Sequence, residues 1–252
     1  MSKEILILNG LRLGYNKEIY GQIDASACAG EMIALVGPNG VGKSTLLKSI
    51  SGIQNFRSGE LIINSKNTRK ISHTEHSSLI SFVPSQSARA NNLSLFDMVS
   101  AGCFSRTNWL GETTKDDNKL IMDTLERVGL SGFALRDSSK LSDGEFQRAA
   151  IARSLVQQSG IILLDEPTAF LDIENKLVIT RLLRKLAQEE NRCIIFSTHD
   201  LQLAIKLCDK IWLMGSEGFR EGSPEILIEN GAFDTMFKDS TLKFDKTLYT
   251  FI

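Results

Sequence analysis

The chain has 252 residues, 42% of them hydrophobic, so it can bury a large core, and its length allows one or two domains. A formal net charge of −1 at pH 7 gives no electrostatic case for a nucleic-acid partner, and we expect none. The cysteines lack CxxC or metal-binding spacing and indicate reduced, mostly buried cytosolic thiols: Cys28, Cys103, Cys193 and Cys208. No signal-peptide architecture or membrane-length apolar run is present, so we expect a soluble chain that reaches a membrane only through partners.

The sequence pattern of residues 1–83 predicts several strands and one helix. Residues 1–30 alternate short strands and turns, with glycines as punctuation. An all-apolar strand at residues 32–36 precedes a helix that begins near Lys43. Two further strands are predicted at residues 60–63 and 79–83.

The remainder of the chain begins with helical periodicity and then alternates helices with apolar strands. No internal repeat or low-complexity stretch interrupts this order. The predicted segments are helices within 87–145, a helix from 146, a strand at 161–164, a helix at 176–190, a strand at 193–197, a helix at 201–207, a strand at 210–214, a helix from 222–224, and short strands and turns over 230–252.

The most informative motif is a glycine-rich run between the first apolar strand and the helix after it. It fits the phosphate-binding loop pattern, and its residues are Gly37, Pro38, Asn39, Gly40, Val41, Gly42, Lys43, Ser44 and Thr45. The three glycines allow backbone N–H groups to approach a polyphosphate, with the positive dihedral angles that such a loop needs. Lys43 can reach the β- and γ-phosphates, and the Ser44 hydroxyl can hold Mg²⁺. The motif therefore predicts a nucleotide site at a helix N-terminus.

A second motif follows the apolar strand at residues 161–164, which ends in Asp165 and Glu166. Its continuous apolar run predicts a strand buried on both faces, and open parallel sheets bind ligands at the carboxyl ends of their strands. Asp165 is placed to reach Mg²⁺, directly or through water, and Glu166 to polarise an attacking water. The weaker alternative is a structural acidic pair at a helix N-terminus before Pro167.

With these motifs in this order, the chain resembles the ATP-binding cassette (ABC) ATPases over essentially its whole length. Leu141–Glu145 is similar to the family signature, although Asp143 and Glu145 stand where a second Gly and a Gln are most common. Both variants are familiar in the family. The resemblance implies nucleotide contacts from four residues of this segment, Ser142, Asp143, Gly144 and Glu145.

Three further residues acquire roles from this resemblance. Ala169–Asp172 is similar to the family's D-loop, and the resemblance implies a site contact from Asp172. His199, in a Ser-Thr-His-Asp run after a strand, is similar to the switch histidine that contacts γ-phosphate; alone, it would be interpreted as a surface or capping residue. Tyr15 is similar to the aromatic residue that stacks on adenine, although an isolated N-terminal tyrosine more often packs in a core.

One motif departs from the family pattern. The family places a Gln directly after Val-Pro at the end of the strand that leads into the helical part. Here Ser85 holds that place and Gln86 follows one residue later. Either the loop is longer by one residue and Gln86 still reaches Mg²⁺, which we favour, or a hydroxyl substitutes.

The resemblance implies an α/β fold with a P-loop (RecA-like) core, a mostly parallel sheet, an N-terminal antiparallel β part and an inserted α-helical subdomain. It implies one ABC ATPase domain over residues 1–252. Its core is 1–86 and 146–229, its helical subdomain with the signature is 87–145, and its C-terminal appendage is 230–252. It also implies ATP and Mg²⁺ as cofactors and a head-to-tail homodimer, in which Ser142 and Gly144 of one chain contact the γ-phosphate held by the other.

The segment Val99–Gly111, with the runs at 165–172 and 197–201, looks like the ATPase subunits of bacterial iron-siderophore, haem and cobalamin importers. Such a subunit works at the cytoplasmic face of the inner membrane, with a permease dimer and, indirectly, a substrate-binding protein. Other transport cargoes, export, and a non-transport ABC ATPase remain alternatives. DNA-repair relatives need a long coiled-coil insertion, and none fits between Gln86 and Leu141; ribosome-acting relatives usually carry two cassettes.

A permease helix is expected in a groove between the core and the helical subdomain, beside Ser85 and Gln86. Such a groove needs apolar anchors with a polar rim. We expect Phe104 and Trp109 to be the partly exposed anchors, whereas Phe96 and Val99 share an inward face. The alternative is that Phe104 and Trp109 are ordinary core.

Overall fold

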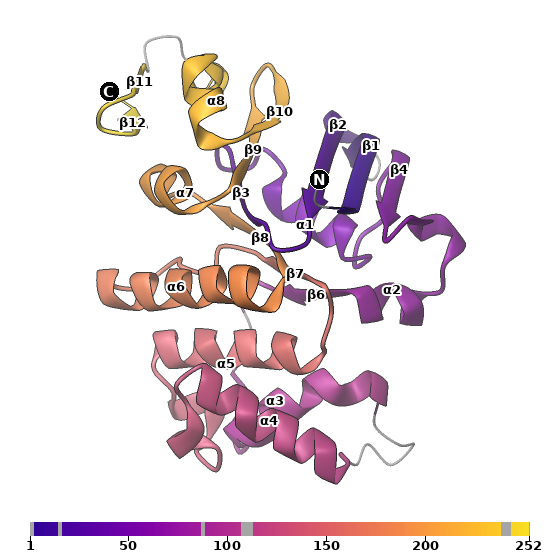
Figure 1. Ribbon diagram of the computed structural model, residues 1–252, viewed down its shortest axis with the longest axis vertical. Helices are drawn as coiled ribbons and strands as arrows, with labels where there is room; N and C mark the ends of the chain where they lie inside the picture. The colour runs from indigo at the N-terminus through magenta and orange to yellow at the C-terminus, as the bar shows by residue number, and fades with distance from the viewer. Residues whose placement is uncertain (1–2, 15–16, 87–88, 107–112, 238–242, 252) are drawn as a thin grey trace.

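The computed structural model describes residues 3–14, 17–86, 89–106, 113–237 and 243–251. A central sheet separates helices at one end of the molecule from the C-terminal elements at the other, and the N-terminal strands stand beside it (Figure 1). Within those residues, no helix has both the length and the apolar character needed to cross a bilayer.

The central sheet has six strands in the order β10-β9-β3-β8-β7-β6. All neighbouring pairs are parallel except β9 and β10, which form an antiparallel hairpin. The predicted mostly parallel sheet is therefore confirmed. Its strands are β3 (Met32–Val36), β6 (Ile80–Val83), β7 (Ile161–Leu164), β8 (Cys193–Thr198), β9 (Lys210–Gly215) and β10 (Gly218–Gly222).

The parallel strands are apolar throughout because both of their faces are buried. In β3, Met32, Ala34 and Val36 belong to one hydrophobic core, whereas Ile33 and Leu35 belong to the other. β7 and β8 divide their side chains between the same two cores. A strand buried on two sides cannot alternate apolar and polar residues, which explains why continuous apolar runs predicted these strands correctly.

The N-terminal sheet is antiparallel, in the order β2-β1-β4-β5, as the resemblance implied. The expectation of short strands over residues 1–30 was wrong, because β1 and β2 each extend over 11 residues. Gly10 has a φ of 55° and lies at a register shift between Leu8 and Leu11, so it forms a bulge within β1 and does not end it. The strands are β1 (Glu4–Gly14), β2 (Glu18–Cys28), β4 (Ser58–Ile63) and β5 (Lys66–Asn67).

Helices cover both faces of the central sheet, and α3, α4 and α5 gather beneath α6 (Figure 1). The strand predicted at 79–83 begins one residue late, because Leu79 ends α2, a helix that the sequence analysis did not predict. The predicted helix at 176–190 begins earlier, at Ile173. The helices are α1 (Lys43–Ile50), α2 (His73–Leu79), α3 (Leu95–Ser100), α4 (Lys115–Arg127), α5 (Asp143–Val156), α6 (Ile173–Glu190), α7 (Leu201–Leu207) and α8 (Pro224–Glu229).

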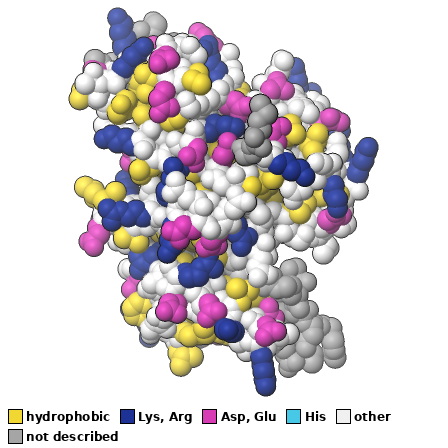
Figure 2. Space-filling model, in the orientation of Figure 1, with side chains coloured by type: hydrophobic (Ala, Val, Ile, Leu, Met, Phe, Trp, Pro, Cys, Tyr) yellow, Lys and Arg dark blue, Asp and Glu magenta, His cyan; other side chains and the backbone are white. Residues whose placement is uncertain are grey.

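After α8 the chain forms a 3₁₀ turn, Ala232–Thr235, and a small hairpin of β11 (Phe244–Asp245) and β12 (Thr250–Phe251). This agrees with the short strands and turns predicted for residues 230–252. All four cysteines are buried, as predicted. On the face shown in Figure 2, acidic and basic side chains are interspersed over all parts of the molecule.

The two-sided burial of β7 yields a stability prediction. Leu163→Ala removes a fully buried side chain from the strand that directly precedes Asp165, so the free energy of unfolding should fall by about 2–5 kcal/mol. Leu135→Ala is the matched control, because Leu135 is 91% exposed, and it should change stability by less than about 0.5 kcal/mol. Chemical denaturation of both variants measures the difference, and equal losses would contradict the described core.

Candidate functional site

The glycine-rich run joins β3 to α1 at the carboxyl edge of the central sheet. Gly40 and Gly42 have positive φ angles of 76° and 117°, as predicted for a loop that turns its N–H groups inward. The prediction of a positive φ was wrong for Gly37. Glycine is needed at this position because the loop packs closely against β9. A Cβ there would lie 2.6 Å from the carbonyl oxygen of Met214 on β9.

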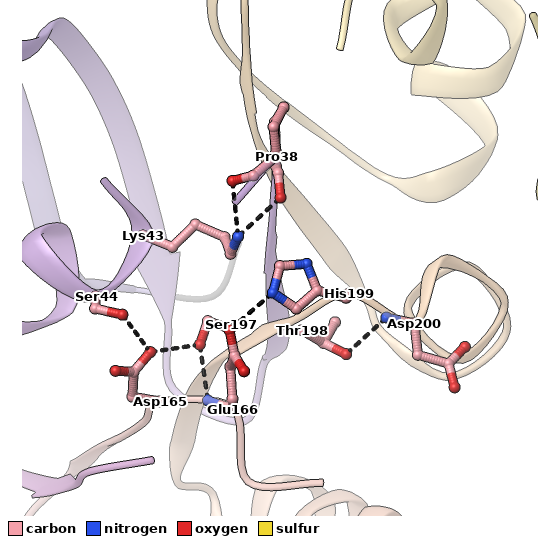
Figure 3. A network of polar contacts seen from close by, with 10 residues as sticks. Pro38, Lys43, Ser44, Asp165, Glu166, Ser197, Thr198, His199 and Asp200 are labelled. Carbon is pink, nitrogen blue, oxygen red and sulfur yellow. Dashed lines mark hydrogen bonds and ion pairs between the residues drawn. The ribbon is translucent and has the colours of Figure 1, made fainter. Parts of the chain in front are cut away.

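The Lys43 side chain folds back over this loop. Its Nζ donates to the carbonyl oxygen of Gly37 at 2.8 Å and to that of Pro38 at 3.0 Å, and the residue is buried (Figure 3). Burial lowers the pKa of the Lys43 ammonium, and the nearby carboxylates of Glu166 and Asp165 oppose that shift. An ammonium held by two carbonyls keeps its third N–H for another acceptor.

Asp165 stands directly after β7 and is almost fully buried. Its Oδ1 accepts from the Ser44 hydroxyl at 2.9 Å, so the structure brings these two predicted metal ligands together (Figure 3). Hard oxygen donors from one carboxylate and one hydroxyl fit Mg²⁺, which usually binds proteins through few ligands and takes the rest from phosphates and water. Among the described residues, there is no group of three or more His, Cys, Asp or Glu that could hold a metal by itself.

Ser197, at the end of β8, completes this buried network, although the sequence analysis gave it no role. Its hydroxyl donates to Asp165 Oδ1 at 2.8 Å and accepts from the backbone N–H of Glu166 at 2.8 Å. The parallel pairing of β7 with β8 places the two strand ends side by side. The sequence signal that could have indicated a role for Ser197 in the site is its position at a strand end, two residues before His199.

Glu166 and His199 face each other at the surface of the site (Figure 3). The Nε2 of His199 lies 2.8 Å from Glu166 Oε1, and both side chains are partly exposed. Glu166 has a φ of 49°, an unfavourable value for a residue with a side chain. The bond from its N–H to Ser197 helps to hold this conformation, in which the carboxylate points toward His199. The predicted catalytic pair is thus brought together.

The signature residues have described contacts outside this network. Ser142 and Glu145 form a capping box at the start of α5, in which each side chain accepts from the other residue's backbone N–H, at 3.3 and 2.8 Å. The hydrogen bond that the backbone N–H of Ser142 donates to the Glu145 carboxylate lowers the pKa of that carboxyl. Asp143 pairs with Arg89, and a Cβ on Gly144 would lie 2.2 Å from Asn175 Oδ1 on α6.

Three further predicted site residues have exposed side chains: Asp172, Ser85 and Gln86. Asp172 is exposed and caps α6, where its Oδ1 accepts from the Asn175 N–H at 2.8 Å. Ser85 and Gln86 are both exposed after β6, and the backbone N–H of Asp165 donates to Val83 in that strand at 2.9 Å. Tyr15 lies outside the described residues. The structure therefore leaves the choice between Ser85 and Gln86 as a prediction.

Comparison with known proteins identifies the family. Residues 20–169 match the family model described as ABC transporter, which is more than half of the chain. The chain belongs to the ABC transporter family. This confirms the family and fold predicted from the motifs, and the chain is a nucleotide-binding transport ATPase of that family.

Two relatives and one solved structure illustrate the similarity. An uncharacterised ABC transporter ATP-binding protein of Methanocaldococcus jannaschii is 34% identical over 83% of this chain and 73% of its own. The iron(3+)-hydroxamate import ATP-binding protein FhuC of Bacillus subtilis is 34% identical over 78% of this chain and 73% of its own. A solved ABC transporter in an inward-facing conformation, assigned to the metal-chelate type, is 27% identical with a TM-score of 0.82, covering 92% of this chain and 88% of its own.

The buried position of Ser197 yields a prediction. Ser197→Ala removes a donor to Asp165 and the acceptor of the Glu166 N–H, so ATP turnover should fall by about 10- to 100-fold, the range for residues that orient metal ligands. The Mg²⁺ concentration for half-maximal rate should rise. Ser77→Ala, an exposed serine on α2, is the control. Unchanged turnover and unchanged Mg²⁺ dependence in Ser197→Ala would contradict this role.

Proposed function

We propose that the chain is the ATP-hydrolysing subunit of an importer that takes up a metal chelate, the class that includes iron-siderophores, haem and cobalamin. The observation that carries the ATPase part is the convergence of Lys43, Ser44, Asp165, Glu166 and His199 at one sheet edge. Support for the chelate class comes from FhuC, which is named for iron(3+)-hydroxamate import, and from the solved metal-chelate type transporter.

Each residue of the site has a defined part in this proposal. The phosphate loop and Lys43 bind the β- and γ-phosphates of ATP, with backbone N–H groups and one ammonium as donors. Ser44 and Asp165 would hold Mg²⁺, with Gln86 as the candidate third ligand, and Mg²⁺ supplies charge neutralisation at the phosphates when it is bound. Glu166 orients and deprotonates the attacking water, and His199, 2.8 Å from it, contacts the γ-phosphate.

The proposal requires two chains for each complete site. The signature begins α5 in the helical part of the chain, whereas the phosphate loop precedes α1 in the core. Following the family resemblance, we assign Ser142, Gly144 and the D-loop residue Asp172 to a partner's nucleotide. Two ATP molecules would then hold a head-to-tail homodimer closed, and hydrolysis would remove charge and contacts from its interface. We propose one ABC ATPase domain with its helical subdomain at 87–145.

Support for a permease docking place comes from a cavity of about 340 Å³, although Ser85 and Gln86, beside which we expected the groove, do not line it. Phe82 of β6 and Ser77 of α2 line one side, and Gly102, Phe104 and Arg153 line the helical side. Phe104 is 80% exposed, as expected for an anchor, whereas Val99 is buried; Trp109 lies outside the described residues. We propose that a permease helix occupies this cavity at the cytoplasmic face of a bacterial inner membrane, and that a substrate-binding protein delivers the chelate.

Two variants test the ATPase proposal. Glu166→Gln keeps the shape of the site but removes the base, so it should bind ATP with Mg²⁺, hydrolyse it at least about 100-fold more slowly, and elute as an ATP-dependent dimer. Lys43→Ala removes a charged phosphate donor and should fail to bind ATP tightly while remaining folded. Nucleotide binding, phosphate release and size-exclusion chromatography provide the readouts. Near-normal turnover in either variant would refute the assigned site.

A third variant tests the docking cavity. Phe104→Ser should leave the ATPase activity of the isolated chain within about twofold, because the side chain is exposed and lies outside the nucleotide site. It should prevent co-purification with the permease or uncouple ATP hydrolysis from uptake. Met122→Ser alters another partly exposed apolar side chain, on α4, and is the control. If Phe104→Ser still couples ATP hydrolysis to uptake normally, Phe104 is an ordinary surface residue and not an anchor for the permease.

A further inference from the structure

The C-terminal hairpin is fixed to the body of the protein by an aromatic cluster. Phe244 stacks on the buried Phe233 with ring centroids 4.6 Å apart, and Phe251 lies edge-on to Phe244 and to Phe237, at 5.6 and 4.8 Å. The backbone N–H of Phe244 also donates to Asp234 Oδ1 at 3.1 Å. Such packing holds the hairpin in one position on the 3₁₀ turn.

The hairpin reaches the segment that carries His199. The Nε2 of Gln202, in the first turn of α7, donates to the carbonyl oxygen of Leu248 at 2.8 Å. Leu248 lies in the turn between β11 and β12, where its N–H and that of Thr247 donate to Asp245 Oδ1 at 2.9 and 2.7 Å. A hydrogen-bonded turn therefore presents one carbonyl to the start of α7.

Gln202 and His199 are joined by a short, hydrogen-bonded segment. Asp200 caps α7 by accepting from the Leu203 N–H at 3.0 Å, and its own N–H donates to the Thr198 hydroxyl at 3.0 Å. A displacement of the first turn of α7 would therefore move His199 relative to Glu166.

The hairpin also forms a wall of a cavity at the ATPase site. This cavity, of about 640 Å³, is lined by the phosphate-loop residues Gly37–Asn39, by the segment His199–Gln202 and by the hairpin residues Tyr249–Phe251. A smaller cavity lined by Glu166 shares His199 and Asp200 with it. His199 thus lines both cavities, one at Glu166 and one at the hairpin.

We propose that the C-terminal hairpin positions His199 for ATP hydrolysis and that Gln202 is the positioning residue that connects them. The inference rests on the proposed function and extends it to residues 243–251. The Gln202 side-chain amide donates to the hairpin, and in this proposal it acts through the orientation of the first turn of α7. Its loss should therefore change the rate of hydrolysis more than the affinity for ATP.

Kinetics of Gln202→Leu give the first test. The side chain keeps most of its volume but loses the donor to Leu248, so kcat should fall by about two- to tenfold, the range for one net hydrogen bond, with KM for ATP unchanged within about twofold. Gln202→Lys keeps an N–H donor and should recover most of the rate. Lys206→Gln changes an exposed side chain on the same helix and should behave as wild type.

A spectroscopic readout separates positioning from a general loss of structure. The chain has only three histidines, so the His199 ring signal can be followed by NMR in the presence of ATP and Mg²⁺ in the Glu166→Gln background. Gln202→Leu should shift the His199 signal while leaving those of His73 and His76 in place. An unmoved His199 signal, or a rise in KM in place of the fall in kcat, would overturn the inference. Absence of ATPase activity in the wild-type chain would instead refute the proposed function.

Discussion

The carboxylate of Asp165 is the point at which three distant segments of the chain meet. It accepts hydrogen bonds from Ser44 at the start of α1 and from Ser197 at the end of β8, and it directly follows β7. A buried carboxylate is costly unless donors surround it, so these hydroxyls are required by its burial. The same donors orient the oxygens that a metal ion would use.

The parallel sheet explains why these segments meet. β3, β8 and β7 are adjacent and parallel, so the phosphate loop, the Ser197–Asp200 run and the acidic pair all leave the sheet at one edge. Each strand is apolar on both faces, which fixes it between the two cores and leaves its end as the place for polar residues. The chemistry of the site therefore depends on the order of strands in the sheet, more than on any single contact in it.

Much of this arrangement could be predicted from sequence because its signals are local. A glycine-rich run after an apolar strand, and two carboxylates after another, each indicate a strand end without knowledge of the fold. The parts that escaped prediction depend on contacts between distant residues. Ser197 had no predicted role, and only the β7–β8 pairing places it against Asp165. The glycines in residues 1–30 indicated turns, whereas the register of β1 with β2 shows a bulge at one of them, Gly10. Gln202 gives no sequence signal, because its partner is a backbone carbonyl 46 residues away.

The contacts of Lys43 and Glu166 show how the site is held ready for a polyphosphate. Two of the three ammonium donors of Lys43 are bound to loop carbonyls, so its position is fixed before any phosphate contributes. Burial lowers the pKa of that ammonium, and a phosphate next to it would oppose this shift by favouring the charged form. Glu166 is held with a positive φ by a bond to Ser197, so its carboxylate is oriented by the same hydroxyl that supports Asp165. Asp165 and Glu166, the proposed metal ligand and base, are therefore coupled through one buried serine, so a change at either residue should affect the other.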